Sequence, residues 1–382
     1  MKHKPKPSSD ALLNVAASEQ DANMLYATRF FAPDPFIFFQ HRGKRFVVMS
    51  DLELDRARRQ AAVDSVLSLT QIEEELKQRK QRLINTAAVL RHLFAQKGIR
   101  AVLVPSSFPL GLADQLRRRG VKVIASPSPL FPERELKSAG EIREIIKAQR
   151  AAEAGVQAAI AMIREARVSA SRILYSGSAK LTSERVKECI ATAVLRHGCV
   201  AGHTIVACGQ QGCDPHDQGS GPLRASQPII LDVFPRSQSS GYWGDITRTV
   251  VKGRASEWVH RAYQAVLSAQ LLALRQIKAD VLSDTIHLSV QEEFQRRGFA
   301  TGSQGGRMQG FFHGTGHGVG LEIHELPRLS LRAPTPLKAG QVVTVEPGLY
   351  YAKMGGVRIE DLVVVTTTGN RNLTRLPKFL EM

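Results

Sequence analysis

The first third of the chain alternates apolar runs with amphipathic stretches, a pattern typical of an α/β sheet. The runs FIFFQ (36–40) and KRFVVMS (44–50) predict an antiparallel strand pair that turns at HRG (41–43). A long charged helix is expected from about Glu73 to Lys97. These elements indicate that the chain opens with an α/β domain.

The next segment continues this pattern and then ends it. The stretches AVLVP (101–105), GLADQLRRRG (111–120) and VKVIAS (121–126) predict strand, helix and strand. Three prolines within 127–132 then interrupt regular structure, so we place a domain boundary there. We expect an α/β N-terminal domain over residues 22–136 and a second domain over 137–382. The polar segment 1–21 is expected to be a disordered tail.

The second part of the chain begins with helical signals and ends in strands. Ser138 followed by Glu141 forms a capping-box signature that opens an amphipathic helix to about Arg167. Further segments are expected to be helical at 182–197, 255–278 and 282–297 and extended at 201–208 and 228–234. From Phe311 onward, strands and turns dominate. The second domain is therefore expected to be α+β.

Composition narrows the class of protein. A chain of 382 residues with 43% hydrophobic content can bury two cores of ordinary domain size. The sequence contains no apolar run of about eighteen residues, so we expect no membrane-spanning helix. The basic N-terminus lacks the apolar core of a secretory signal. The four cysteines form no C-x-x-C pair, and we expect free thiols and a cytoplasmic location.

The chain is strongly basic, with a formal net charge of +17 and a pI near 10. Such a charge invites a nucleic-acid hypothesis, because dense Lys and Arg neutralise phosphates. The basic residues, however, are spread over both halves, and the runs at 77–82 and 117–119 fit solvated helix faces without interleaved aromatic residues. We therefore expect no nucleic-acid partner.

Five potential metal ligands lie in short strand-like segments of the second half. Four are carboxylates and one is an imidazole: Asp232, Asp245, His317, Glu346 and Glu360. Carboxylate oxygens can bridge two divalent cations while the imidazole caps one of them, and two cations can hold a hydroxide between them at neutral pH. The set points to metal-assisted hydrolysis.

Four segments around these residues carry a family resemblance: LDVFPRSQSSGYWGDITRTVV, FFHGTGHGVGLEIHELP, VVTVEPGLY and GGVRIEDLVVV. They resemble the signature strands of the pita-bread metallopeptidases, the group of aminopeptidase P, prolidase, methionine aminopeptidase and creatinase. The order and identity of all five ligands match. With a first domain that is similar to the creatinase-type N-terminal domain, the resemblance covers nearly the whole chain, and it is far more specific than one motif.

The resemblance implies two divalent metal ions per subunit, with Asp232 chelating one and Asp245 bridging both. We expect manganese, with cobalt or zinc as alternatives, because the donor set is rich in hard oxygen ligands. One departure concerns the interval from Asp232 to Asp245, which is two residues longer than usual, with the excess within 235–240. A hairpin tolerates insertion at its tip. A register shift by an odd residue would instead turn one carboxylate away.

Further polar residues match positions near the substrate in these peptidases. His216, His313 and His324 resemble residues that contact substrate and stabilise the tetrahedral intermediate. Arg358 either orients the carboxylates or forms a plain salt bridge to one of them. Glu346 is expected to shuttle a proton to the leaving nitrogen. His203 has no clear counterpart and is expected to be structural or to line the pocket.

The resemblance implies a metal-dependent hydrolase that cleaves before proline. Methionine aminopeptidases lack a creatinase-type first domain, and creatinase works without metals, so Xaa-Pro cleavage remains. The sequence leaves open whether the substrate is a longer peptide, as for aminopeptidase P, or an Xaa-Pro dipeptide, as for prolidase. A homodimer is implied by resemblance alone. The alternative is a catalytically inactive pita-bread protein that binds nucleic acid or a protein partner.

Overall fold

The computed structural model describes residues 9–332 and 334–382, which form two compact units. The units divide between Arg134 and Glu135, two residues before the boundary expected from the prolines. A short 3₁₀ helix, η1 (Pro132–Glu135), covers this division. Each unit has its own apolar core.

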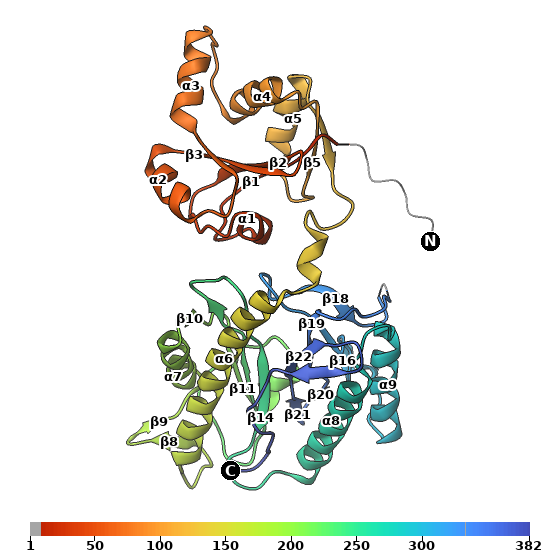
Figure 1. Ribbon diagram of the computed structural model, residues 1–382. Coiled ribbons are helices and arrows are strands. Elements are labelled where there is room, and N and C mark those ends of the chain that lie inside the picture. The colour runs from red at the N-terminus through yellow and green to blue at the C-terminus, as the bar shows by residue number, and fades with distance from the viewer. Residues whose placement is uncertain (1–8, 333) are drawn as a thin grey trace. The chain divides into compact units, whose positions relative to one another are not determined.

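The first unit is a six-stranded mixed sheet with helices on both faces (Figure 1). The strand order is β4-β3-β2-β1-β5-β6. The strands are β1 (Ala11–Ala16), β2 (Phe36–His41), β3 (Lys44–Met49), β4 (Ser65–Ser68), β5 (Ala101–Val104) and β6 (Lys122–Ala125). The helices are α1 (Ala22–Thr28), α2 (Asp51–Gln60), α3 (Leu69–Gln78), α4 (Thr86–Lys97) and α5 (Leu110–Arg118).

Period-two alternation sends side chains of the β2–β3 hairpin to opposite faces of this sheet. Phe39 packs with α3, α4 and α5, whereas Phe38 packs with α1 and α2. The hairpin agrees with the strand pair predicted from the sequence. The parallel pair β5 and β6, joined by α5, agrees with the predicted strand, helix and strand.

Two expectations for this unit are wrong. Residues 1–8 lie outside the described part of the chain, but the rest of the predicted tail is ordered, because β1 pairs with both β2 and β5 inside the sheet. The single helix expected over 73–97 is two helices, α3 and α4. Lys80 has a positive φ of 57°, and the Asn85 side chain accepts the amide hydrogen of Ala88, which starts a new helix.

The second unit consists of two helix-covered groups of strands. In the first group, α6 (Ala139–Glu165) and α7 (Ser183–Arg196) pack side by side against a sheet of β11 (Ile205–Cys208), β12 (Ile229–Val233) and β14 (Ile246–Val250). The predicted capping box of Ser138 and Glu141 opens α6. Small strands complete this group: β7 (Arg167–Val168), β8 (Leu174–Ser176), β9 (Ala179–Lys180), β10 (Cys199–Val200) and β13 (Arg236–Ser237), with the 3₁₀ helix η2 (Gly209–Cys213).

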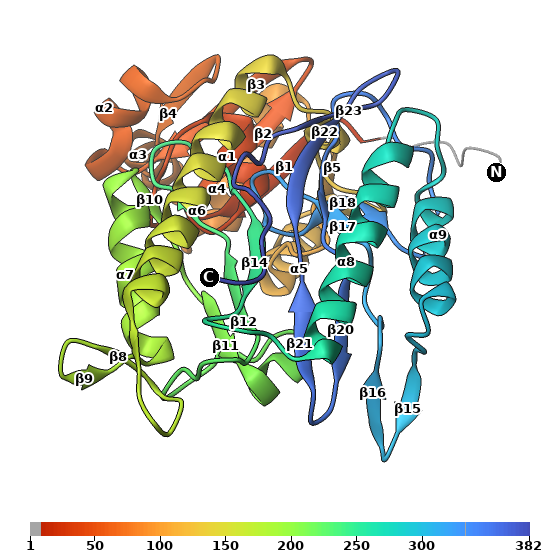
Figure 2. The same ribbon diagram turned by 90° about the horizontal axis from the view of Figure 1, so that it is seen from below.

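The second group pairs α8 (Glu257–Gln276) and α9 (Ser283–Arg296) with the C-terminal strands (Figure 2). Its five-stranded sheet has the order β18-β17-β19-β22-β23. These strands are β17 (Gly316–Gly318), β18 (Glu325–Leu329), β19 (Val342–Val345), β22 (Asp361–Val365) and β23 (Asn370–Asn372). Two hairpins accompany it, β15 (Gly302–Gln304) with β16 (Arg307–Gln309) and β20 (Gly348–Tyr351) with β21 (Gly355–Arg358).

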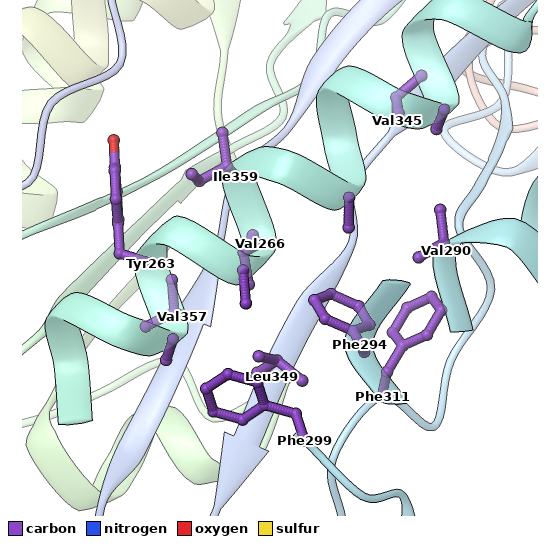
Figure 3. Packing of buried hydrophobic residues seen from close by; sticks show 14 of the residues in the cluster. Tyr263, Val266, Val290, Phe294, Phe299, Phe311, Val345, Leu349, Val357 and Ile359 are labelled. Atoms are coloured by element: carbon purple, nitrogen blue, oxygen red, sulfur yellow. The ribbon is translucent and has the colours of Figure 1, made fainter. Parts of the chain in front are cut away.

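The apolar side of α8 fills the core of the second group. Figure 3 shows Val266 of α8 beside Val357 and Ile359, with Phe294 and Phe311 in the same cluster. Burial of these side chains stabilises the packing of α8 against the strands next to Glu346 and Glu360. The two groups are joined by hydrogen bonds from the amide of Glu360 to the carbonyl of Thr247 (3.0 Å) and from the Thr249 hydroxyl to the carbonyl of Arg358 (2.9 Å).

The cysteines and the membrane expectation can also be compared with the structure. Cys189, Cys199, Cys208 and Cys213 are all free thiols, as predicted. Among the described residues, 9–332 and 334–382, no helix has both the length and the apolar character needed to cross a membrane.

Candidate metal centre

The second unit contains an open cavity of about 1190 Å³. All of the site residues expected from the sequence line it: His203, His216, Asp232, Asp245, His313, His317, His324, Glu346, Arg358 and Glu360. They come from segments spread over more than 150 residues of sequence. The junction of the two strand groups therefore gathers them in one place.

The hairpin of β12 and β14 carries the first two carboxylates. Asp232 pairs with Thr247, and the same register continues outward through Arg236 opposite Trp243 to a hydrogen bond from the Ser237 amide to the Tyr242 carbonyl. In this register Asp232 and Asp245 are diagonal neighbours on one face. The longer loop therefore adds residues only at the tip, 238–241, and turns neither carboxylate away.

Three ligand atoms from different strands converge beside this hairpin. One atom each from Asp245, His317 and Glu360 lie within 4.8 Å of one another, and all three residues are buried. Glu346 follows β19, and its Oε1 lies 3.3 Å from Nε2 of His317. Oδ2 of Asp245 lies 3.8 Å from the same nitrogen. Buried acids and an imidazole at such separations suit a cation better than they suit one another.

The tautomer of His317 suits metal binding. Its Nδ1 lies 3.1 Å from the carbonyl oxygen of Gly318, which can only accept, so Nδ1 carries the hydrogen. This leaves the Nε2 lone pair directed toward Asp245 and Glu346. A histidine that binds a metal through one ring nitrogen usually donates the hydrogen of its other ring nitrogen to an acceptor such as a backbone carbonyl, which fixes the orientation of the ring.

Two threonines hold the carboxylates in place. The Thr247 hydroxyl donates to Oε2 of Glu360 (2.8 Å). The Thr344 hydroxyl accepts the amide hydrogen of His317 (3.0 Å) and lies 3.3 Å from Oε1 of Glu346, to which it donates. Because both threonines lie two residues from a ligand on a strand, alternation places them on the ligand face. This signal was available in the sequence, and our sequence reasoning missed it.

A model of metallopeptidase family M24 matches residues 143–367. The chain belongs to metallopeptidase family M24. Membership places it in a family of metal-dependent hydrolases, and the matched segment contains all five candidate ligands.

Known proteins agree with this assignment. The M24 chain is 31% identical to the Xaa-Pro dipeptidase of Pyrococcus horikoshii over 296 residues, which covers 75% of this chain and 76% of that protein. It is 39% identical to the uncharacterized peptidase YqhT of Bacillus subtilis over 176 residues, 46% of this chain and 47% of YqhT. The latter match therefore spans about half of that relative's length.

Solved structures show the fold. The X-Pro aminopeptidase of Thermotoga maritima superposes with a TM-score of 0.81 at 24% identity, covering 98% of this chain and 97% of that chain. The M24 chain thus has the pita-bread fold, as expected from its signature strands, preceded by an α/β domain.

A buried network connects the M24 ligands to the cavity wall. Arg358 donates to Oδ2 of Asp232 (2.7 Å) and to the Tyr350 hydroxyl (2.8 Å). Tyr350 in turn lies 3.0 Å from Nε2 of His313, whose Nδ1 lies 2.7 Å from the carbonyl of Gly314. Nδ1 must donate to that carbonyl, so Nε2 accepts the Tyr350 hydrogen. Both ring nitrogens of His313 therefore form hydrogen bonds within the protein. Arg358 forms a salt bridge to Asp232, which is one of the two roles expected for it from the sequence.

The other histidines line the cavity more openly. His324 is exposed to the cavity, and its ring lies 4.3 Å from that of His317 in an edge arrangement. His216 is exposed on a loop, and its backbone amide donates a hydrogen bond to Oδ1 of Asp214 (3.0 Å). His203 has a positive φ of 59° and contacts Gln218 through Nδ1 (3.2 Å). His203 therefore lines the pocket, in keeping with its expected role.

Burial controls the titration of the M24 cluster. Loss of hydration, followed by the charges of Asp232 and Glu346, raises the pKa of Asp245 well above its usual value. Loss of hydration likewise raises the pKa of Glu360 well above its usual value and the pKa of Glu346 to about 7. The pKa of His317 falls to about 3, chiefly by burial. Without a cation, burial therefore favours the protonated forms of Asp245, Glu346 and Glu360 and the neutral form of His317.

Three further cavity residues were not singled out from the sequence. Arg328 lies opposite His317 in the β17–β18 pair and is exposed to the cavity. His287 and Gln291 lie one turn apart on α9 and line another wall. No local motif marks them, because their place depends on how α9 and β18 pack around the ligands.

Proposed function

We propose that the chain is a dinuclear-metal peptidase that hydrolyses the bond between an N-terminal residue and proline. The convergence of Asp245, His317 and Glu360 in a cavity, with Asp232 and Glu346 beside them, carries this proposal. The Xaa-Pro specificity of the Pyrococcus horikoshii relative supports the substrate class. The intact donor set disfavours an inactive binding protein.

The donor set fits two divalent cations. Asp232, Asp245, His317, Glu346 and Glu360 would hold them, with the Nε2 lone pair of His317 already free of hydrogen. Four carboxylates with one imidazole suit manganese, with cobalt or zinc as alternatives. When bound, such cations polarise a carbonyl and lower the pKa of water at the site.

The chain's own residues would then handle protons and orientation. Glu346, beside His317, accepts the proton of the attacking water and passes it to the leaving nitrogen. His324 is open to the cavity and donates a hydrogen bond to the oxyanion of the tetrahedral intermediate. Arg358 and Tyr350 hold Asp232 in position, and Tyr350 fixes the ring of His313 in the wall.

The position of Arg328 in the cavity wall favours a dipeptide over a longer peptide as the substrate. Arg328 lies opposite His317 in the β17–β18 pair and lines the cavity, so its guanidinium is part of the cavity wall beside the site. Burial is the main cause of the lowered pKa of His317 and of His324, and the positive charge of Arg328 adds to it. Arg332 lines the same cavity. A free carboxylate on the proline of an Xaa-Pro dipeptide would pair with this wall. The dipeptidase type is therefore our proposal for the substrate.

The test uses metal-stripped protein with and without added manganese. It is assayed on an Xaa-Pro dipeptide, the same dipeptide with an amidated C-terminus, an Xaa-Pro-Yaa tripeptide and a peptide without proline. We expect manganese-dependent cleavage that is fastest for the free dipeptide, and a higher KM for that dipeptide alone in Arg328→Gln. Faster cleavage of the tripeptide would assign the aminopeptidase type. Equal cleavage without proline would contradict the Xaa-Pro proposal.

A further inference from the structure

Lys137 is a buried cation that lies outside the metal ligands. Its side chain is 1% exposed, and Nζ lies 2.5 Å from Oε1 of Glu325, whose side chain is 10% exposed. The backbone amide of Lys137 is also fixed, because it donates to the carbonyl of Gly340 (2.9 Å). A buried pair of this kind is rarely needed for stability alone, since removal of both charges can be neutral. Its position is therefore informative.

Glu325 begins the strand that lies against His317. The β17–β18 register runs from His317 opposite Arg328 to Gly318 opposite Glu325, so Leu326 and Pro327 form a bulge between these pairs. Bulges beside active sites redirect neighbouring side chains. Here the bulge lies between His324 and Arg328, both of which reach the cavity.

The carboxylate of Glu325 is clamped from two sides. Lys137 contacts it on one side, and on the other it packs directly on Gly320, where an added Cβ would lie 2.3 Å from Oε1 of Glu325. Trp243 fixes the same loop at its start, because its amide donates to the Gly320 carbonyl (3.0 Å) and its indole Nε1 donates to the Leu321 carbonyl (3.2 Å). The loop 321–324 is thus held at both ends.

We infer that Lys137 is a positioning residue, which sets the place of His324 through its ion pair with Glu325. His324 itself is exposed to the cavity, and no hydrogen bond of its ring occurs within residues 9–332 and 334–382. Its location therefore depends on the backbone on either side, of which Glu325 is the adjacent residue. This inference rests on the proposed function only for its effect on turnover.

Substitution of the pair separates positioning from stability. In Lys137→Met, the kcat for an Xaa-Pro dipeptide should fall roughly tenfold to a hundredfold with little change in KM, because a misplaced catalytic group affects mainly the chemical step. Lys137→Arg keeps the charge and should restore most of the kcat. Lys338→Met removes an exposed cation from a nearby segment and should leave kcat unchanged.

The double variant Lys137→Met with Glu325→Leu removes both charges of the buried pair together, a change that is often neutral for stability. It should unfold at nearly the wild-type temperature and bind the same amount of manganese, yet keep the low kcat. Wild-type kcat in this variant would overturn the inference, as would a loss of metal that accounts for the loss of turnover.

A second measurement does not depend on peptidase activity. The imidazole ¹⁵N signals of His324, assigned with His324→Gln, should shift in the metal-free double variant, while those of the distant His260 stay in place. Unchanged His324 signals would overturn the positioning role. If the wild-type protein cleaves no peptide but the double variant shows this shift, the proposed function is contradicted and the link from Lys137 to His324 stands.

Discussion

Arg358 donates a hydrogen bond of 2.7 Å to Oδ2 of Asp232, so the guanidinium shares a carboxylate with the candidate metal centre. The same side chain contacts Tyr350 and Thr247, and it is almost wholly buried. One positive charge thereby offsets part of the negative charge of the carboxylates before any cation binds. The ligand set is organised by the protein and does not depend on the metal alone.

Loss of Arg358 should destabilise the metal-free protein. Arg358→Met leaves Asp232 buried without its cation, and breaking a buried pair in this way costs about 3–5 kcal/mol. Urea unfolding of the metal-stripped variant should show this decrease in the free energy of unfolding. Arg371→Met, at an exposed site on β23, should change it by less than about 0.5 kcal/mol. Equal values for the two variants would contradict the role of Arg358.

Metal binding should release protons at pH 6 and fewer at pH 8. Burial raises the pKa of Glu346 from its usual 4.5 to about 7, so at pH 6 a cation displaces its proton, whereas at pH 8 that proton is already lost. His317, with a pKa of about 3, contributes none. Calorimetric titration with manganese in two buffers of different ionisation enthalpy measures the release. A heat independent of the buffer at pH 6 would disprove this prediction.

The raised pKa of Glu346 also predicts how the stability of the metal-free protein changes with pH. Because the folded-state pKa of Glu346 lies above its usual value, the folded protein binds the proton more tightly than the unfolded chain does. The contribution of Glu346 to the free energy of unfolding should therefore decrease as pH rises from about 4.5 to about 7. Comparing the pH dependence of wild type with that of Glu346→Gln isolates this contribution, and a rising contribution would be inconsistent with it.

The tip of the β12–β14 hairpin should tolerate shortening. Deletion of Ser239 and Ser240 leaves the pairs from Asp232 opposite Thr247 to Ser237 opposite Tyr242 intact, so metal content and kcat should stay within about twofold of wild type. Deletion of Phe234 alone shifts the register by one and should abolish metal binding. Metal analysis after dialysis distinguishes the two deletions, and their equivalence would refute the register argument.

Gly316 should be intolerant of a side chain. A Cβ there would lie 2.0 Å from the carbonyl oxygen of Thr344, and backbone cannot move aside as a flexible side chain does. Gly316→Ala should lower the free energy of unfolding by roughly 4 kcal/mol or more and displace the adjacent His317. Gly202→Ala, where no atom lies within 4 Å, is the matched control. Similar denaturation midpoints for both variants would rule out this close approach.

The sequence predicted the ligand strands because their signals are local. Asp232 ends an apolar run and Asp245 precedes another, so a hairpin between them follows from alternation and turn chemistry. The pairing of Arg358 with Asp232 spans 126 positions, so the sequence suggested an ion pair with one of the candidate ligand carboxylates but not with which one. Nothing near Lys137 or Glu325 in the sequence indicates their pairing. Contacts of this length arise from packing of whole elements and leave no periodic trace.

Two fold errors had local causes. The strand β1 was hidden by the basic, proline-containing start, which outweighed the short apolar run ALLNVA. The break between α3 and α4 was missed because charged residues continue through it, although Asn85 is a standard N-cap residue. In both places a short signal competed with a longer compositional one, and the short signal determined the structure.

The most direct test of the metal centre is a titration of metal-stripped protein with manganese while the initial rate of Xaa-Pro dipeptide cleavage is followed. The five-ligand site predicts that the rate rises from near zero and levels off at about two equivalents of metal per chain, and that Glu346→Gln stays inactive throughout while the exposed Glu322→Gln follows wild type. Cleavage that needs no metal, or full activity in Glu346→Gln, would contradict the account.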